Sequence, residues 1–87
     1  MHEKSLIDNL LKKIESIAKE QNATGIKSVH VKLGALSHIS EEHFREHFNN
    51  ETIGTIVDGS KLLVKSSDDI NDPNAQDILL TSVEVEV

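Results

Sequence analysis

The apolar residues at the start of the chain recur every three or four positions, with charged residues between them. This spacing gives a helix one apolar and one polar face, so the sequence predicts an amphipathic helix over residues 4–21. Residues 22–25, which include Asn22 and Gly25, are expected to end it. The apolar face of this helix comprises Leu6, Ile7, Leu10, Leu11, Ile14, Ile17 and Ala18.

Three later segments alternate apolar and polar residues, which is the period of a β-strand with one buried face. The first of them contains Val29, Val31 and Leu33, separated by polar residues. Residues 61–65 and 78–87 are the second and third predicted strands. In the last strand, one face is expected to carry Thr81, Val83, Val85 and Val87, and the other Ser82, Glu84 and Glu86.

A second helix is predicted over residues 40–53. Ser40 is a typical N-cap residue, and the two glutamates that follow it suit the positive end of the helix dipole. Phe44 and Phe48 are four residues apart and therefore lie on one face of this helix. Gly54 can end the helix with a positive φ angle.

The predicted element order is α-β-α-β-β. We expect a single two-layer α/β domain over residues 1–87, in which two helices pack on one face of a small three-stranded mixed sheet. The other face of the sheet is expected to be solvated, because polar and charged residues alternate with the apolar ones. Residues 66–77, rich in Ser, Asp and Asn, are expected to form an exposed loop.

Composition narrows the functions open to this domain. The 87 residues include no cysteine, which excludes thiolate zinc sites, iron–sulfur clusters and cysteine nucleophiles. A net charge of −6 and only two aromatic residues argue against nucleic acid as a partner. The N-terminal segment has neither the unbroken apolar run of a signal peptide nor that of a membrane span. We therefore expect a cytoplasmic protein with no membrane partner.

The first three residues, Met1, His2 and Glu3, carry the donor atoms of a terminal metal chelate. A free α-amine, the deprotonated amide nitrogen of His2 and the His2 imidazole can close two chelate rings around one ion. Glu3 can complete a four-coordinate plane, which suits Ni(II) or Cu(II) better than tetrahedral zinc. A histidine at position 2 is more often a solvated residue of an unordered terminus, so the donor atoms alone leave both interpretations open.

Four other histidines lie further along the chain. His43 and His47 stand four residues apart, a spacing that allows two imidazoles to share an ion, but such a pair alone more often marks a solvated helix face. His38 lies just before the Ser40 cap and is either a loop histidine or a residue that approaches the terminus. His30 alternates out of the apolar face of its strand, and we expect it on the solvated face.

Several strings of the sequence resemble the HypA/HybF family of nickel metallochaperones. The opening MHEKSLIDNLL is similar to the family's MHE start and first helix. The strings VHVKLGALSHISEEHF and ETIGTIVDGSKLLVK are similar to the family's strand, turn and second helix and to its entry into the second strand. SVEVEV is similar to the closing strand, so the resemblance covers nearly the whole chain apart from residues 66–77.

The resemblance implies a function and a set of ligands. By the family's pattern, His2 is the principal nickel ligand, Met1 contributes its amine and Glu3 assists, and His38 becomes a candidate further ligand because it lies in a turn close to the terminus. The family delivers Ni(II) during maturation of a nickel enzyme such as nickel-iron hydrogenase or urease. The expected partners are a nickel-delivery GTPase and a hydrogenase or urease precursor, and the expected role is a metallochaperone rather than an enzyme.

One departure from the family pattern limits what the resemblance implies. Family members normally carry two CxxC pairs, inserted between the last two strands, that hold a zinc ion. Here the loop at residues 66–77 stands in place of that zinc domain, so zinc is not expected. Two other functions remain open: a metal-free adaptor that only binds a maturation partner, and a small metal-dependent enzyme that uses His43 and His47. The protein could also form a homodimer.

Overall fold

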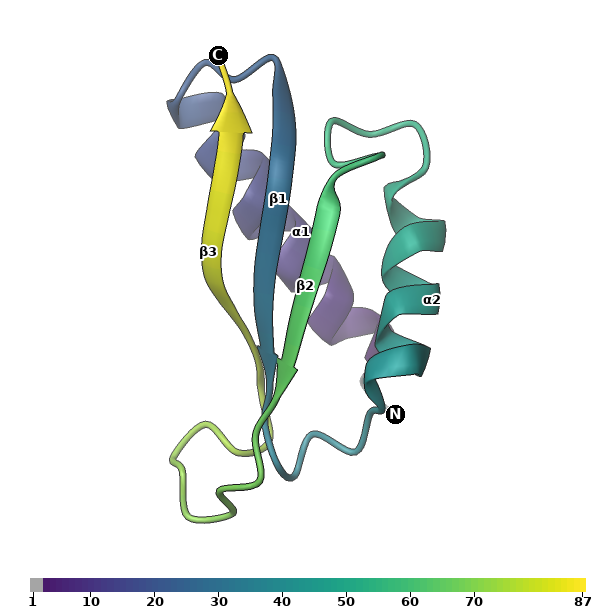
Figure 1. The fold of residues 1–87 in the computed structure, drawn as a ribbon, viewed down its shortest axis with the longest axis vertical. Coiled ribbons are helices and arrows are strands. Elements are labelled where there is room, and N and C mark those ends of the chain that lie inside the picture. The colour runs from purple at the N-terminus through teal and green to yellow at the C-terminus, as the bar shows by residue number, and fades with distance from the viewer. Residues whose placement is uncertain (1–2) are drawn as a thin grey trace.

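The computed structural model describes residues 3–87, with the side chains described from residue 4 onward, and contains two helices and three strands (Figure 1). In chain order the elements are α1 (Glu3–Glu20), β1 (Gly25–Leu33), α2 (Glu41–Thr52), β2 (Lys61–Ser66) and β3 (Ile78–Glu86). The predicted order α-β-α-β-β is confirmed. Among the described residues, no helix is long and apolar enough to cross a bilayer.

β1 is the central strand of the sheet, whose order is β2-β1-β3. It pairs in parallel with β2, where Val29 lies opposite Leu62 and Val31 opposite Val64. It pairs antiparallel with β3, where Val29 lies opposite Val83. Parallel neighbours need a crossover connection, and α2 supplies it between β1 and β2.

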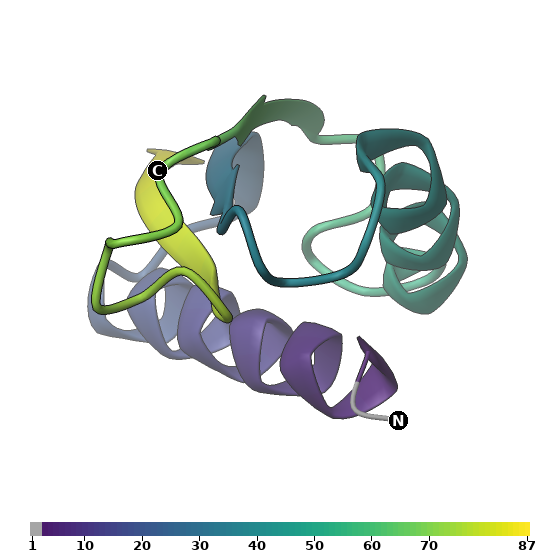
Figure 2. The ribbon, with the colours of Figure 1, turned by 90° about the horizontal axis from the view of Figure 1, so that it is seen from below.

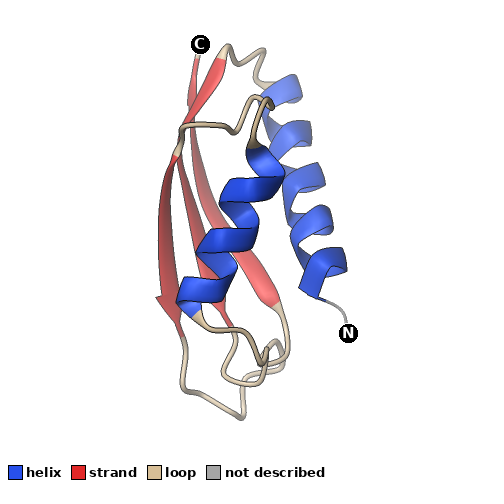
Figure 3. Ribbon diagram, turned by 90° about the vertical axis from the view of Figure 1, so that its right-hand side faces the viewer, coloured by secondary structure: helices blue, strands red, loops and turns tan. Residues whose placement is uncertain are grey.

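Both helices cover the same face of the sheet, as predicted (Figures 2 and 3). The core between these two layers is aliphatic, with the Phe44 and Phe48 rings of α2 as its largest buried side chains. The two rings lie with their centroids 5.7 Å apart. The opposite face of the sheet has no helix over it, and it carries the half-buried His30 between Leu63 of β2 and Ser82 of β3. The expected placement of His30 on the solvated face is thus confirmed.

Two extra residues interrupt the pairing of β1 with β3. Lys27 has no partner between Ile26 and Ser28, and Thr81 has none between Leu80 and Ser82. A bulge of this kind lets residues three apart face the same side, so Leu80 and Val83 both pack against the core. Thr81 is exposed instead, and its hydroxyl donates a hydrogen bond to the His30 carbonyl at 3.1 Å.

The expected placement of Thr81 and Val87 on the apolar face with Val83 and Val85 is therefore wrong. Strict alternation overlooks the extra residue at Thr81, which shifts the period by one position. Val87 follows the end of β3 and is 87% exposed. Val83 and Val85 themselves pack against the core as expected.

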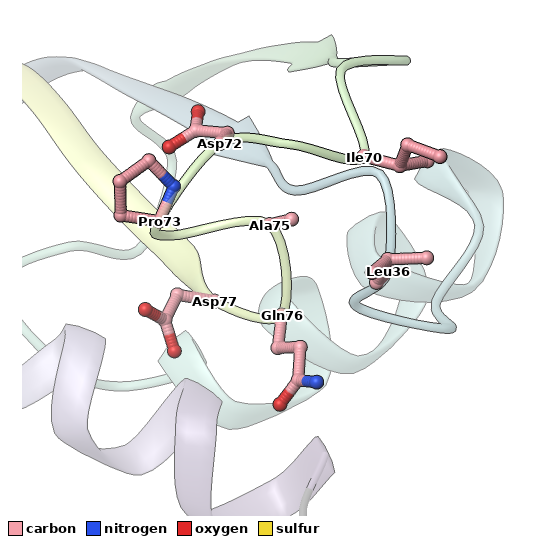
Figure 4. Close-up of a pocket in the computed structure, with 7 residues that line it drawn as sticks. All are labelled: Leu36, Ile70, Asp72, Pro73, Ala75, Gln76 and Asp77. Carbon is pink, nitrogen blue, oxygen red and sulfur yellow. The ribbon is translucent and has the colours of Figure 1, made fainter.

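The loop at residues 66–77 is anchored to the turn that follows β1. The Gly34 N–H donates to the Asp77 carbonyl at 2.9 Å, and the Leu36 N–H donates to the Ala75 carbonyl at 2.7 Å. Ala75 is buried, and it lines a pocket together with Leu36 (Figure 4). The segment is mostly exposed, as predicted, but it is fixed at its C-terminal half.

The charge of Asp72 ties the same loop to β1. Its carboxylate accepts a hydrogen bond from the Asn74 N–H at 2.9 Å and lies 3.4 Å from Lys32 Nζ. The Asn74 hydrogen bond is the largest cause that lowers the pKa of Asp72 below its usual 3.8, and Lys32 adds to it against an opposing effect of burial. The ionised form of Asp72 is therefore favoured in the folded protein.

We predict that Gly34→Ala destabilises the protein by about 1–3 kcal/mol, because an added Cβ would overlap the backbone carbonyl of Ala75 and push the loop away. Gly25→Ala is the matched control, since its Cβ would meet only the flexible end of Glu86 at 3.2 Å. Thermal unfolding of both variants checks this. Equal loss of stability in the two variants would contradict the anchored loop.

We predict that Asp72→Asn lowers stability at neutral pH and that this deficit disappears in acid. A carboxyl whose pKa is lowered by folding stabilises the protein above its unfolded pKa, and this contribution is lost as the pH falls through the folded pKa, below 3.8. Urea unfolding of wild type and variant at neutral pH and at about pH 3 measures the difference. Asp68→Asn in the same loop is the control, and a deficit that is independent of pH would refute the role of the charge.

Candidate metal site at the start of α1 and on α2

The start of α1 is held against α2 by an ion pair. Lys4 Nζ donates to Glu51 Oε1 at 3.0 Å and also lies 3.5 Å from Asp8 Oδ2, one turn further along α1. The hydrogen bond to Glu51, followed by the charge of Asp8, raises the pKa of Lys4, so the ammonium form is favoured. The first turn of α1 therefore lies beside α2, as the ribbon also shows (Figures 2 and 3).

α2 begins at a defined residue and has a defined inner face. The Ser40 hydroxyl accepts the His43 N–H at 3.1 Å, which confirms the predicted N-cap. Phe44 and Phe48 are 0% and 1% exposed and fix the side of α2 that faces the core. Gly54 follows the helix with φ at +80°, as expected for a residue that ends it.

The flanks of α2 face different neighbours. On one flank, Arg45 donates to the Leu62 carbonyl of β2 at 2.8 Å and to Glu41 at 3.1 Å. The other flank carries His43, His47 and Glu51, which follow one another at intervals of four residues and thus form a row along the helix. Glu51, the last residue of this histidine row, binds Lys4 at the start of α1.

The two histidines of the row are in contact. His43 Nε2 and His47 Nε2 lie 3.1 Å apart, with ring centroids 4.7 Å apart and ring planes inclined by 53°. In the neutral state one ring donates and the other accepts this hydrogen bond. His43 is exposed and His47 half-buried, so the pair can be reached from solvent.

The terminal chelate falls largely outside what the structure describes. Met1 and His2 lie outside the described residues, and Glu3 is described as the first residue of α1 but without its side chain. His38 is exposed in the segment between β1 and α2, with φ at +58°. Within residues 4–87 its side chain makes no ion pair or hydrogen bond, and its approach to the terminus stays a prediction.

Within residues 4–87 there is no group of three or more His, Asp or Glu side chains that can hold a metal ion. The contact that the sequence did not reveal is Lys4 with Glu51, which joins residues 47 positions apart. The sequence did contain one hint of this contact, because Glu51 continues the four-residue spacing of His43 and His47. The spacing shows that the three residues form a row on α2, but it does not show which element Glu51 contacts.

Comparison with known proteins identifies the family. The family model described as "HypA: Hydrogenase/urease nickel incorporation, metallochaperone, hypA" matches residues 1–70. The hydrogenase maturation factor HypA of Methylocella silvestris is 36% identical over 62 residues, which cover 71% of this chain and 55% of that protein. The protein of the same name from Aquifex aeolicus is 34% identical over 65 residues, covering 75% of this chain and 56% of the relative.

Solved structures share the fold. The solution structure of the Ni metallochaperone HypA from Helicobacter pylori superposes with a TM-score of 0.78, covers 99% of this chain and 98% of that chain, and is 19% identical. A second solution structure, of a HypA protein, gives a TM-score of 0.68 at 21% identity. The chain spans about half the length of the curated relatives that it matches. On the family model and these relatives together, the chain belongs to the HypA family of maturation factors.

Proposed function

We propose that this chain binds one Ni(II) at Met1, His2 and Glu3 and delivers it to a partner protein during maturation of a nickel enzyme. The observation that carries the proposal is the match of residues 1–70 to a family described by nickel incorporation and metallochaperone function. That stretch contains the three terminal residues whose donor atoms suit the ion. The proposed chelate needs a free amine on Met1.

The chemistry of the donors favours Ni(II) or Cu(II) over zinc. The α-amine of Met1, the amide nitrogen of His2 and the His2 imidazole give three nitrogen donors that lie in one plane, the tetragonal arrangement typical of these two ions. Glu3 or His38 supplies the remaining position. Cu(II) binds such nitrogen-rich sites more tightly than Ni(II), so selectivity for nickel has to come from metal availability or from the partner.

The fold supports this site by holding the beginning of α1 in place. Lys4 follows directly after the three ligands, and its ion pair with Glu51 fixes the first turn of α1 beside α2. Because the three ligands are consecutive, the chelate closes small rings, which lowers the entropic cost of binding.

The proposed role is that of a binding and delivery protein rather than an enzyme. By the family's pattern, the recipients are a nickel-delivery GTPase and the precursor of a hydrogenase or urease in the cytoplasm. Residues 66–77 replace the family's zinc domain in the proposal, so no structural zinc takes part. The proposal gives this chain none of the partner contacts that depend on the zinc domain.

We predict that Ni(II) binds the terminal chelate of protein with a native, untagged terminus in a saturable one-to-one complex. His2→Ala removes the imidazole, and an extension of several residues before Met1 moves the free amine away from the chelate, so both changes are expected to abolish Ni(II) binding at the terminal site. Isothermal titration calorimetry measures stoichiometry and affinity. His30→Ala, on the solvated face of the sheet, is the matched control and is expected to bind like wild type.

Other outcomes of this titration would separate the alternatives. Binding that survives both terminal changes unaltered would refute the terminal chelate. Absence of any Ni(II) binding, together with capture of the GTPase partner, would favour a metal-free adaptor of the same fold.

A further inference from the structure

We propose that His43 and His47 form a second metal site, a two-imidazole chelate on α2 that binds a divalent transition ion such as Ni(II). The site consists of residues described in the structure and does not depend on the terminal chelate. Whether the His43–His47 site binds a metal ion does not depend on the proposed function. Its use as a second nickel site during delivery rests on that function.

The distance between the two imidazole nitrogens fits one shared ion. An imidazole nitrogen lies about 2.1 Å from a bound first-row divalent ion. The two Nε2 atoms lie 3.1 Å apart. If each lies about 2.1 Å from the same ion, the N–ion–N angle is about 95°. This value is close to the 90° between neighbouring ligands of a square-planar or octahedral ion, the geometries of Ni(II).

The backbone that carries the pair is already fixed. Ser40 caps the helix through the His43 N–H, and Phe44 and Phe48 are buried beside the two histidines. Arg45 holds the opposite flank to the Leu62 carbonyl of β2. Because the rings are also in contact before any ion binds, chelation costs little side-chain entropy.

The surroundings of the pair favour a cation. Glu42 and Glu46 line a shallow surface hollow together with Ser40 and His43. The chain as a whole carries a net charge of −6. Acidic groups beside the histidine pair raise the local concentration of divalent ions without having to coordinate them.

Two imidazoles leave most coordination positions of the ion to water or to donors from another molecule. Such an open site exchanges its ion readily, unlike a closed structural site with four protein ligands. Imidazole suits Ni(II), Cu(II) and Zn(II), whereas Mg(II) and Ca(II) prefer oxygen ligands. Glu51, the last residue of the histidine row, binds Lys4, which directly follows the residues of the terminal chelate in the sequence.

The test uses protein extended by several residues before Met1, in which the free amine is too far from His2 to form the terminal chelate. Ni(II) is titrated into it while the imidazole ¹⁵N resonances are followed by NMR. We expect the signals of His43 and His47 to shift or broaden together and to saturate, while those of His30 and His38 do not change. Loss of either ring, in His43→Gln or His47→Gln, should weaken binding by about tenfold or more.

The double variant His43→Gln, His47→Gln should abolish the residual binding, and His30→Gln in the same extended background should leave it unchanged. Amide spectra of each variant confirm that α2 remains folded. No saturable binding by the extended protein, or binding unaffected by the double variant, would overturn the second site. Either result leaves the terminal chelate to its own test, which uses the native terminus and His2→Ala.

Discussion

Burial of the inner face of β1 is the constraint on which the rest of the structure depends. β1 is hydrogen-bonded on both edges, and Val29, Val31 and Leu33 on its inner face are each at most 2% exposed. A chain of this size has room for one core, so both helices must cover this one face. The apolar side of α1 and the Phe44 and Phe48 rings of α2 meet there, and the two helices are thereby brought next to one another.

The helix arrangement determines where metal-binding chemistry can lie. With Phe44 facing the core and Arg45 bound to β2, the histidine row lies on the remaining flank of α2, and its last residue, Glu51, binds Lys4 at the start of α1. His43 and His47, the candidate donors that the structure describes, therefore lie at the surface of the helical layer rather than inside the core. A partner could approach an ion bound there without the core opening.

Most of the fold could be predicted from the sequence, because its signals are local. Each of these signals depends on neighbours within a few residues. They are the apolar spacing of α1, the Ser40 cap, the phenylalanine pair and the positive φ of Gly54. The placement of Thr81 was wrong because a bulge is decided by pairing with β1. The anchoring of Ala75 in the loop was overlooked for a similar reason, since its partner is the turn at Leu36.

The candidate sites likewise combine features that are local in the sequence with features that depend on tertiary contacts. The donor atoms of Met1, His2 and Glu3, and the spacing of His43 and His47, are readable from the sequence. The 3.1 Å approach of the two imidazoles and the contact of Lys4 with Glu51 depend on rotamers and on the packing of one helix against another. Spacing alone predicted which residues share a face, and only the tertiary structure relates that face to the start of α1.

We infer that nickel binds at the terminal chelate and at the histidine row of α2. The most direct test is the ¹H–¹⁵N amide spectrum of the untagged protein, recorded before and after addition of Ni(II). We predict that shifted or broadened signals are confined to the first turn of α1 and to the residues around His43, His47 and Glu51. Changes centred on His30 or on residues 66–77, or a spectrum that does not change, would contradict this inference.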